Sequence, residues 1–289
     1  MRALSMLLIA AGMAVSGMSP AAADTTAERL SKLVACHKAL QEGDWQHTIA
    51  LCSEVLQTGG GTDEEKAFAL ANRGYAYASS GDYEGAMSDF DEAIRLRPQD
   101  AINYTDRGEA YSALNQFDKA IADFSKAISL QPQASSSYYN RGMVYAESGE
   151  NDPAITDFSE AIRLDPANQA AYRDRGAAYA QKNDYAHAMP DFDQALRMDP
   201  SDAFAYNNRG LAEAHQGQYD RALADLDAAI RINPNNSLAY FNRAYAAYAK
   251  GDRAQAANDC AQAIALDPNH GPLSYTSQTF RCTKDGPQP

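Results

Sequence analysis

The sequence is poor in the residues from which catalytic sites and nucleic-acid surfaces are usually built. Its 289 residues include only four cysteines, five histidines and one tryptophan. Lysine and arginine number 25 against 38 aspartates and glutamates, which gives a net charge of −13. Binding to phosphate backbones or to anionic lipid draws on surplus basic side chains, so this composition argues against both. Hydrophobic residues make up 45% of the chain, enough for a large core.

The sequence also lacks the patterns that mark common active sites. It has no Ser/His/Asp set and no glycine-rich phosphate loop, and its acidic residues follow a structural period. An enzyme built on helical repeats is the competing class of function, and no group of residues supports it. We therefore predict that the chain is not an enzyme and needs no cofactor.

Only one long apolar run is present, and it lies at the N-terminus. Arg2 is followed by "LSMLLIAAGMAVSGM" and then by "SPAAADTT", the pattern of a signal peptide with an A-x-A cleavage site. We predict that residues 1–23 are removed after Ala23. The alternative, an uncleaved anchor, requires a longer span without Gly12 and Gly17. The prediction is an exported protein, periplasmic or alternatively secreted, without stable membrane insertion after cleavage.

What the sequence has in abundance is an internal repeat of 34 residues. Four series of identical residues keep this step. They are Pro98, Pro132, Pro166, Pro200, Pro234 and Pro268; Gly74, Gly108, Gly142, Gly176 and Gly210; Ala86, Ala120, Ala154, Ala188, Ala222 and Ala256; and Ala93, Ala127, Ala161, Ala195, Ala229 and Ala263. Chance does not hold four series in register over this length.

The period has a helical cause. Tyr138, Gly142 and Tyr145 share one face of a first helix, and a second helix follows the "SGEND" break. The closing "DP" ends that second helix, because proline disfavours helix in the residue before it. Each helix pair leaves an apolar face that the next pair covers. The sequence therefore predicts an all-α solenoid of antiparallel helix hairpins.

This unit resembles the tetratricopeptide repeat. The family's pattern is matched, in one unit, by Tyr138, Gly142, Tyr145, Ala154, Phe158, Ala161 and Pro166. Six full units follow one another without insertion, at 67–100, 101–134, 135–168, 169–202, 203–236 and 237–270. The resemblance implies a right-handed superhelix whose inner groove holds a peptide or a segment of a partner protein. Glu213 departs from the pattern, because other units carry tyrosine there; it either weakens packing or serves the groove.

The two ends of the array diverge, as terminal units of a solenoid do. In residues 24–66, "GDWQHTIALCSEVLQ" aligns with "GDYEGAMSDFDEAIR" of the first full unit, which predicts a divergent N-terminal hairpin. Residues 271–289 are predicted to be a capping segment and tail, with a short helix in "GPLSYTSQTFRC".

In repeat register the four cysteines predict two disulfides. Cys36 takes the small-residue position of a first helix and Cys52 the aromatic position of the second, which lie at similar levels in a hairpin. Cys260 and Cys282 would then join the last hairpin to the tail. The alternative is a zinc site formed by Cys36, His37, His47 and Cys52, but in register these side chains do not converge as tetrahedral zinc requires.

Two charged series follow the same period. Arginines repeat on the first helices and aspartates on the second: Arg73, Arg107, Arg141, Arg175, Arg209 and Arg243, with Asp89, Asp123, Asp157, Asp191, Asp225 and Asp259. Equal numbers of opposite charges favour a structural ladder, because a partly buried arginine needs a partner. The alternative is an arginine ladder for an anionic ligand.

By resemblance, the groove is lined by set positions of the first helices. Candidate partner-binding residues there are Phe68, Tyr75, Phe204, Leu211, Leu238, Phe241, Tyr245 and Tyr248. The aromatic ones near the C-terminus either anchor a partner or pack against the tail. Four asparagines, Asn72, Asn140, Asn208 and Asn242, either hold a peptide backbone or bond the neighbouring hairpin. Lysines that clamp a carboxylate in some family members are missing at the matching positions.

Together these observations predict a non-catalytic interaction module or scaffold outside the cytoplasm, binding a protein or peptide partner in its groove. The alternative is a structural subunit of a cell-envelope complex that uses its convex face.

Overall fold

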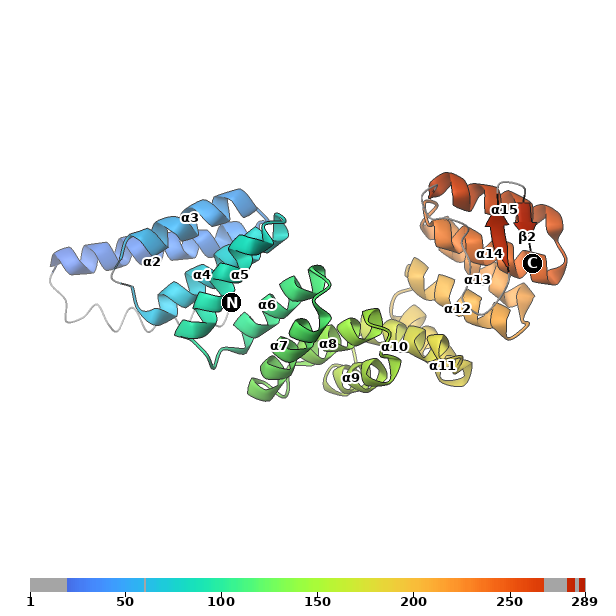
Figure 1. Ribbon diagram of the computed structural model, residues 1–289, viewed down its shortest axis with the longest axis horizontal. Coiled ribbons are helices and arrows are strands. Elements are labelled where there is room, and N and C mark those ends of the chain that lie inside the picture. The colour runs from blue at the N-terminus through green and yellow to red at the C-terminus, as the bar shows by residue number, and fades with distance from the viewer. Residues whose placement is uncertain (1–19, 60, 268–279, 284–285, 289) are drawn as a thin grey trace. The chain divides into compact units, whose positions relative to one another are not determined.

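The computed structural model describes residues 20–59, 61–267, 280–283 and 286–288 (Figure 1). The apolar run of the predicted signal peptide and most of the predicted capping segment lie outside the described residues. The chain divides into two compact units, Met1–Val144 and Tyr145–Pro289, called here the N-terminal and C-terminal units.

The described residues form fourteen helices and two short strands, so the fold is the predicted all-α repeat solenoid. The helices are α2 Pro20–Gln41, α3 Trp45–Gln57, α4 Asp63–Ser79, α5 Tyr83–Leu96, α6 Ala101–Ala113, α7 Phe117–Leu130, α8 Ser135–Glu147, α9 Asn151–Leu164, α10 Gln169–Gln181, α11 Tyr185–Met198, α12 Ala203–His215, α13 Tyr219–Ile232, α14 Ser237–Lys250 and α15 Arg253–Leu266. Each 34-residue repeat contains one helix pair, and α2 with α3 form a further hairpin ahead of them.

The turns inside the hairpins follow one design. One residue of the turn adopts a left-handed backbone conformation, which glycine and asparagine tolerate best, for example Gly81 (φ 88°) and Asn183 (φ 60°). In several hairpins an aspartate then caps the second helix. Asp82 accepts a hydrogen bond from the Gly85 amide in this way. The repeat therefore fixes where each helix stops and the next begins.

The repeated glycines let the two helices of a hairpin approach closely. A Cβ atom at Gly74 would lie 2.9 Å from Phe90 Cε1, and one at Gly108 would lie 3.0 Å from Phe124 Cε1. Both phenylalanines are fully buried. In these hairpins the core is thus a large ring packed over a helix that has no side chain at that position, and Leu226 replaces the ring opposite Gly210.

A second aromatic series joins successive hairpins. The aromatic residue at the start of a second helix packs against a hydrophobic cluster. That cluster includes the tenth residue of the next repeat. This holds for Tyr83 with Ala110, Phe117 with Val144, Tyr185 with Ala212 and Tyr219 with Ala246. Apolar burial between neighbouring repeats is what stabilises a solenoid.

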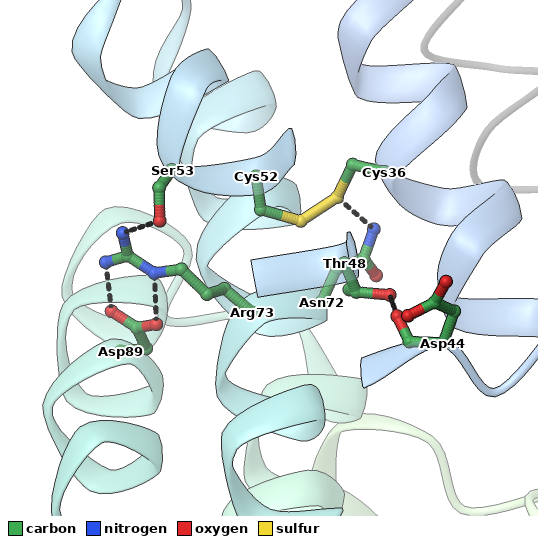
Figure 2. The surroundings of a disulfide bond; sticks show 8 residues. All are labelled: Cys36, Asp44, Thr48, Cys52, Ser53, Asn72, Arg73 and Asp89. Carbon is green, nitrogen blue, oxygen red and sulfur yellow. Dashed lines mark hydrogen bonds and ion pairs between the residues drawn. A yellow bond between two sulfur atoms is a disulfide. The ribbon is translucent and has the colours of Figure 1, made fainter. Parts of the chain in front are cut away.

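Both predicted disulfides are confirmed. Cys36 bonds Cys52 across α2 and α3, and Cys260 bonds Cys282 between α15 and the tail. Figure 2 shows the first of them buried between helices, with the Asn72 amide donating to Cys36 Sγ at 3.7 Å. Because the disulfide uses both Cys36 and Cys52, the alternative zinc site loses its two sulfur ligands.

The charged series form the structural ladder. Within the N-terminal unit, Arg73 donates two hydrogen bonds of 2.7 Å to the Asp89 carboxylate and a third, of 2.9 Å, to Ser53 Oγ on the preceding hairpin (Figure 2). In the C-terminal unit, Arg175 bonds Asp191 and Ser159 in the same way. Each such arginine therefore ties its own hairpin to the one before it.

The tail departs from the expected helix where the structure describes it. Residues Arg281–Thr283 form strand β1, which pairs antiparallel with β2, Gly286–Gln288. The disulfide at Cys282 holds this hairpin against α15, and Phe280 lies in the last hydrophobic cluster. The C-terminal hairpin of helices is thus covered by a tethered strand pair.

Candidate functional site

Three of the aromatic candidates are covered by the tail. Phe241 is 2% exposed, and its ring centroid lies 5.6 Å from that of Phe280. Tyr245 and Tyr248 contact the same ring at 5.7 and 5.2 Å. Of the two interpretations given above, the structure shows packing against the tail at these positions. Phe241 is therefore an internal residue, whereas Tyr245 and Tyr248 pack on the tail and stay partly exposed.

The candidates in the N-terminal unit are partly exposed. Phe68 contacts the His37 ring at 5.2 Å, and Tyr75 contacts the Trp45 ring at 6.2 Å.

Burial, together with nearby Glu109, raises the pKa of Asp106 to about 8. This part of the first-helix surface is therefore less anionic at neutral pH than its composition indicates.

Three of the candidate asparagines donate hydrogen bonds to the neighbouring hairpin. Asn72 donates to Cys36, and Asn242 donates to Asn207 Oδ1 at 2.9 Å; both asparagines are buried. Asn140 donates to Glu109 Oε1 at 2.8 Å. The fourth, Asn208, is half-buried on α12 and accepts a hydrogen bond from the adjacent Asn207. Asn208 differs from the other three because it lines a cavity.

The C-terminal unit contains a cavity of about 570 Å³ beside α10 and α12. It combines two predicted groove residues, Asn208 and Leu211, with residues that the sequence analysis did not identify. Amide side chains supply much of its polar lining: Asn151, Gln181, Asn183 and Asn208. The rest of the lining is apolar or aromatic: Ala177, Ala180, Tyr185, Leu211, Ala212 and His215.

One wall of this cavity is a ring stack. The Tyr185 and His215 rings lie 5.9 Å apart and within 14° of parallel, and the Tyr185 hydroxyl donates to Asn183 Oδ1 at 2.9 Å. His215 also contacts Tyr245, whose ring packs on Phe280. The wall is therefore held by the hydrogen bond to Asn183 on the Tyr185 side and by aromatic packing against Tyr245 on the His215 side.

The cavity is electrically neutral in an acidic chain. Its lining, as far as the structure describes the chain, holds no aspartate, glutamate, lysine or arginine. Burial lowers the pKa of His215 and raises the pKa of Tyr185, so both rings are uncharged at neutral pH. A ligand with a formal charge would lose its hydration here without gaining an opposite charge.

The two remaining apolar candidates are exposed elsewhere on the first helices. Phe204 is 60% exposed and Leu238 is 48% exposed, near the start of α12 and α14 respectively. Arg173 lies 6.0 Å from the Phe204 ring. Neither side chain lines the cavity.

The repeat pattern does not reveal the cavity, which lies beside a position where an aromatic side chain is absent. At the start of the second helix, four repeats carry an aromatic ring, whereas the repeat at 135–168 carries Asn151. That departure was visible in register. Its consequence depends on how α9, α10 and α12 pack, which the repeat pattern alone does not show.

Among the described residues, no group of three or more histidine, cysteine, aspartate or glutamate side chains is placed to hold a metal ion. None of the described helices has the length and apolarity that a membrane crossing requires.

Solved structures with similar folds are numerous. YrrB, described as a TPR protein with an unusual peptide-binding site, is 26% identical with a TM-score of 0.51, covering 63% of this chain and 93% of that one. A tetratricopeptide repeat protein from Parabacteroides merdae is 18% identical with a TM-score of 0.66, covering 84% and 94%. PilW, a type IV pilus biogenesis factor, is 20% identical with a TM-score of 0.64, covering 70% and 94%. No curated protein matches the chain.

The residue ranges matched by family models agree with the positions of the helix pairs. A model described as "TPR repeat" matches residues 74–115, 108–149 and 142–183, and one described as "Tetratricopeptide repeat" matches 173–237 and 207–271. The matches run through most of the region whose glycines, alanines and prolines keep the 34-residue step. With its helix hairpins, its glycine–phenylalanine contacts and these matches, the chain belongs to the tetratricopeptide repeat family.

Proposed function

We propose that the protein is a non-catalytic interaction module outside the cytoplasm, and that it binds an extended peptide segment of a partner along the first helices of its C-terminal unit. Proteins of this family are generally protein-interaction modules, and the fold is typically a non-catalytic scaffold. The cavity beside α10 and α12 is the observation that carries the proposal.

The cavity has the properties of a peptide contact. Its amide side chains both donate and accept hydrogen bonds, as a peptide backbone requires. The alanines, Leu211 and the ring stack offer apolar surface to a side chain, and a neutral lining suits an uncharged main chain. Similarity to YrrB, whose description includes a peptide-binding site, supports the same class of ligand.

Export is the second part of the proposal. The signal-peptide pattern of residues 1–23 supports it, and so do the two disulfides, because such bonds persist mainly in oxidising compartments. Mass spectrometry of the protein from its source cells tests this part. The expected mature N-terminus is Asp24, in the periplasmic or secreted fraction. An intact N-terminus in the cytosolic fraction would contradict export.

A displayed library of random peptides tests the binding part. The disulfide-bonded chain should select peptides, and Ala180→Trp should abolish their binding because the indole occupies the cavity. Ser112→Trp is the matched control, because it lies at the same repeat position on α6 of the N-terminal unit and is not part of the cavity lining. Selected peptides that bind both variants equally would show that the cavity is not the site.

A further inference from the structure

The cavity marks a gap in the aromatic series that joins successive hairpins. Tyr83, Phe117, Tyr185 and Tyr219 each place a ring against the next repeat. The equivalent residue of the repeat at 135–168 is Asn151, whose shorter side chain lines the cavity instead. The cavity therefore lies beside a position that has no aromatic ring.

We propose, resting on the function proposed above, that the cavity is a specificity pocket for an aromatic side chain carried by an uncharged stretch of the partner peptide. The partner's ring takes the place of the ring that the repeat lacks at Asn151. Flanking residues of the peptide then lie against the amides of Gln181, Asn183 and Asn208.

Three properties of the pocket carry this inference. Its apolar surface comes from Ala177, Ala180 and Leu211, small and aliphatic side chains beside which a flat ring can pack. The Tyr185–His215 stack provides an aromatic wall, and aromatic rings pack favourably against one another. A volume of about 570 Å³ holds a ring together with adjoining main chain.

The charge of the pocket lining determines which residues can flank the aromatic residue in the partner peptide. The chain has a net charge of −13, yet the described lining of this pocket carries no charged side chain. An acidic residue beside the ring would meet an acidic protein and lose hydration on entry. A basic residue would find no carboxylate in the lining. Amide and hydroxyl side chains match the pocket best, because the asparagines and the glutamine can donate to them or accept from them.

The test is calorimetric titration of the disulfide-bonded chain with end-capped peptides GSGQYQGSG, GSGQAQGSG and GSGEYEGSG. The first should bind, and the second and third should bind at least about tenfold more weakly, as expected when an interface loses its anchor or buries an unpaired charge. Because all three peptides meet the same unmodified chain, this comparison needs no variant to fold.

Asn151→Tyr supplies the protein side of the test. It restores the ring that four other repeats have, so the fold is kept while the pocket is filled, and binding of GSGQYQGSG should fall at least about tenfold. Arg253→Tyr is the matched control, because it places a tyrosine at the same repeat position outside the pocket. It should leave binding unchanged.

The outcomes separate the two proposals. Equal binding of the tyrosine and alanine peptides, no binding of the tyrosine peptide, or full binding by Asn151→Tyr overturns the aromatic pocket. If library peptides without an aromatic residue still bind and Ala180→Trp blocks them, the proposed function stands and only the aromatic pocket fails. If Ala180→Trp blocks no peptide, the proposed function fails as well.

Discussion

At the scale of single residues, Glu213 is the clearest conflict between the repeat and this sequence. It stands on α12 where tyrosine occupies four other repeats, and it is only 6% exposed. Its Oε2 atom has no hydrogen-bond partner among the residues that the structure describes. Burial, with Asp225 nearby, raises the pKa of Glu213 to about 7, although Arg209 and Arg221 act in the opposite direction.

This shift predicts a pH-dependent stability. The pKa is raised in the folded state, so the unfolded chain loses its proton first as pH rises from 4.5 to about 7. The contribution of Glu213 to the free energy of unfolding therefore falls across this window and stays low above it. Glu213→Gln should stabilise the protein at pH 8, by at most about 3 kcal/mol, and much less at pH 4.

Urea unfolding of wild type and Glu213→Gln at pH 4 and pH 8 measures this difference. Glu84→Gln is a suitable control, since Glu84 is an exposed glutamate in the first turn of α5. A stabilisation by Glu213→Gln that is equal at both pH values would contradict a raised pKa at Glu213.

Single residues were only partly predictable from the sequence. The pairing of Cys36 with Cys52 followed from repeat register, because register states which side chains lie level in a hairpin. The covering of Phe241 by Phe280 did not follow, since the tail has no register with the repeats. The position of Asn151 in the cavity lining also did not follow from the sequence, because it depends on how neighbouring helices pack.

At the scale of the helices, the arginine–aspartate ladder fixes one hairpin on the next. Asp191 on α11 is buried and holds Arg175 on α10 through two hydrogen bonds of 2.8 and 2.7 Å. Arg175 also reaches Ser159 on α9. The contact thus involves three helices, and loss of the Asp191 carboxylate affects all of them.

Asp191→Ala should destabilise the C-terminal unit by about 3 kcal/mol, because it leaves a partly buried guanidinium without its carboxylate. Glu160→Ala removes an exposed ion pair with Arg163 on α9 and should change the free energy of unfolding far less, because solvent screens such a pair. Urea midpoints of both variants give the comparison. Similar losses for the two would mean that the ladder is no stronger than a surface pair.

The N-terminal hairpin depends on its disulfide in a different way. The bond joins α2 to α3 over a sequence separation of 16 residues. Replacing both Cys36 and Cys52 by serine should lower the free energy of unfolding by about 3 kcal/mol, since the unfolded chain regains the freedom of that loop. Denaturation of wild type and variant under oxidising conditions measures it; unchanged stability would contradict a structural role.

Register also explains why the helices were predicted well. Proline and the left-handed turn residues set helix ends, and the alanines and glycines set the buried faces, so both were readable from the period. The tail has neither signal. Its described residues form a strand pair, because the disulfide at Cys282 and pairing with Gly286–Gln288 decide its conformation.

At the scale of the whole molecule, the identical parts of the repeat array build the scaffold, and departures from the repeat line the candidate site. The ladders and the glycine contacts recur along the chain, whereas the neutral pocket occurs where one repeat loses its ring. We therefore propose that partner recognition takes place on the first helices of the C-terminal unit. The alternative is partner recognition on the second helices, which lie on the opposite face of each hairpin.

Nuclear magnetic resonance of the labelled protein with a library-selected peptide tests this assignment most directly. Amide shifts that change most at Ala177, Asn208, Leu211 and His215, on α10 and α12, are the predicted result. Changes confined to the second helices α11 and α13 would contradict it and support binding through the convex face.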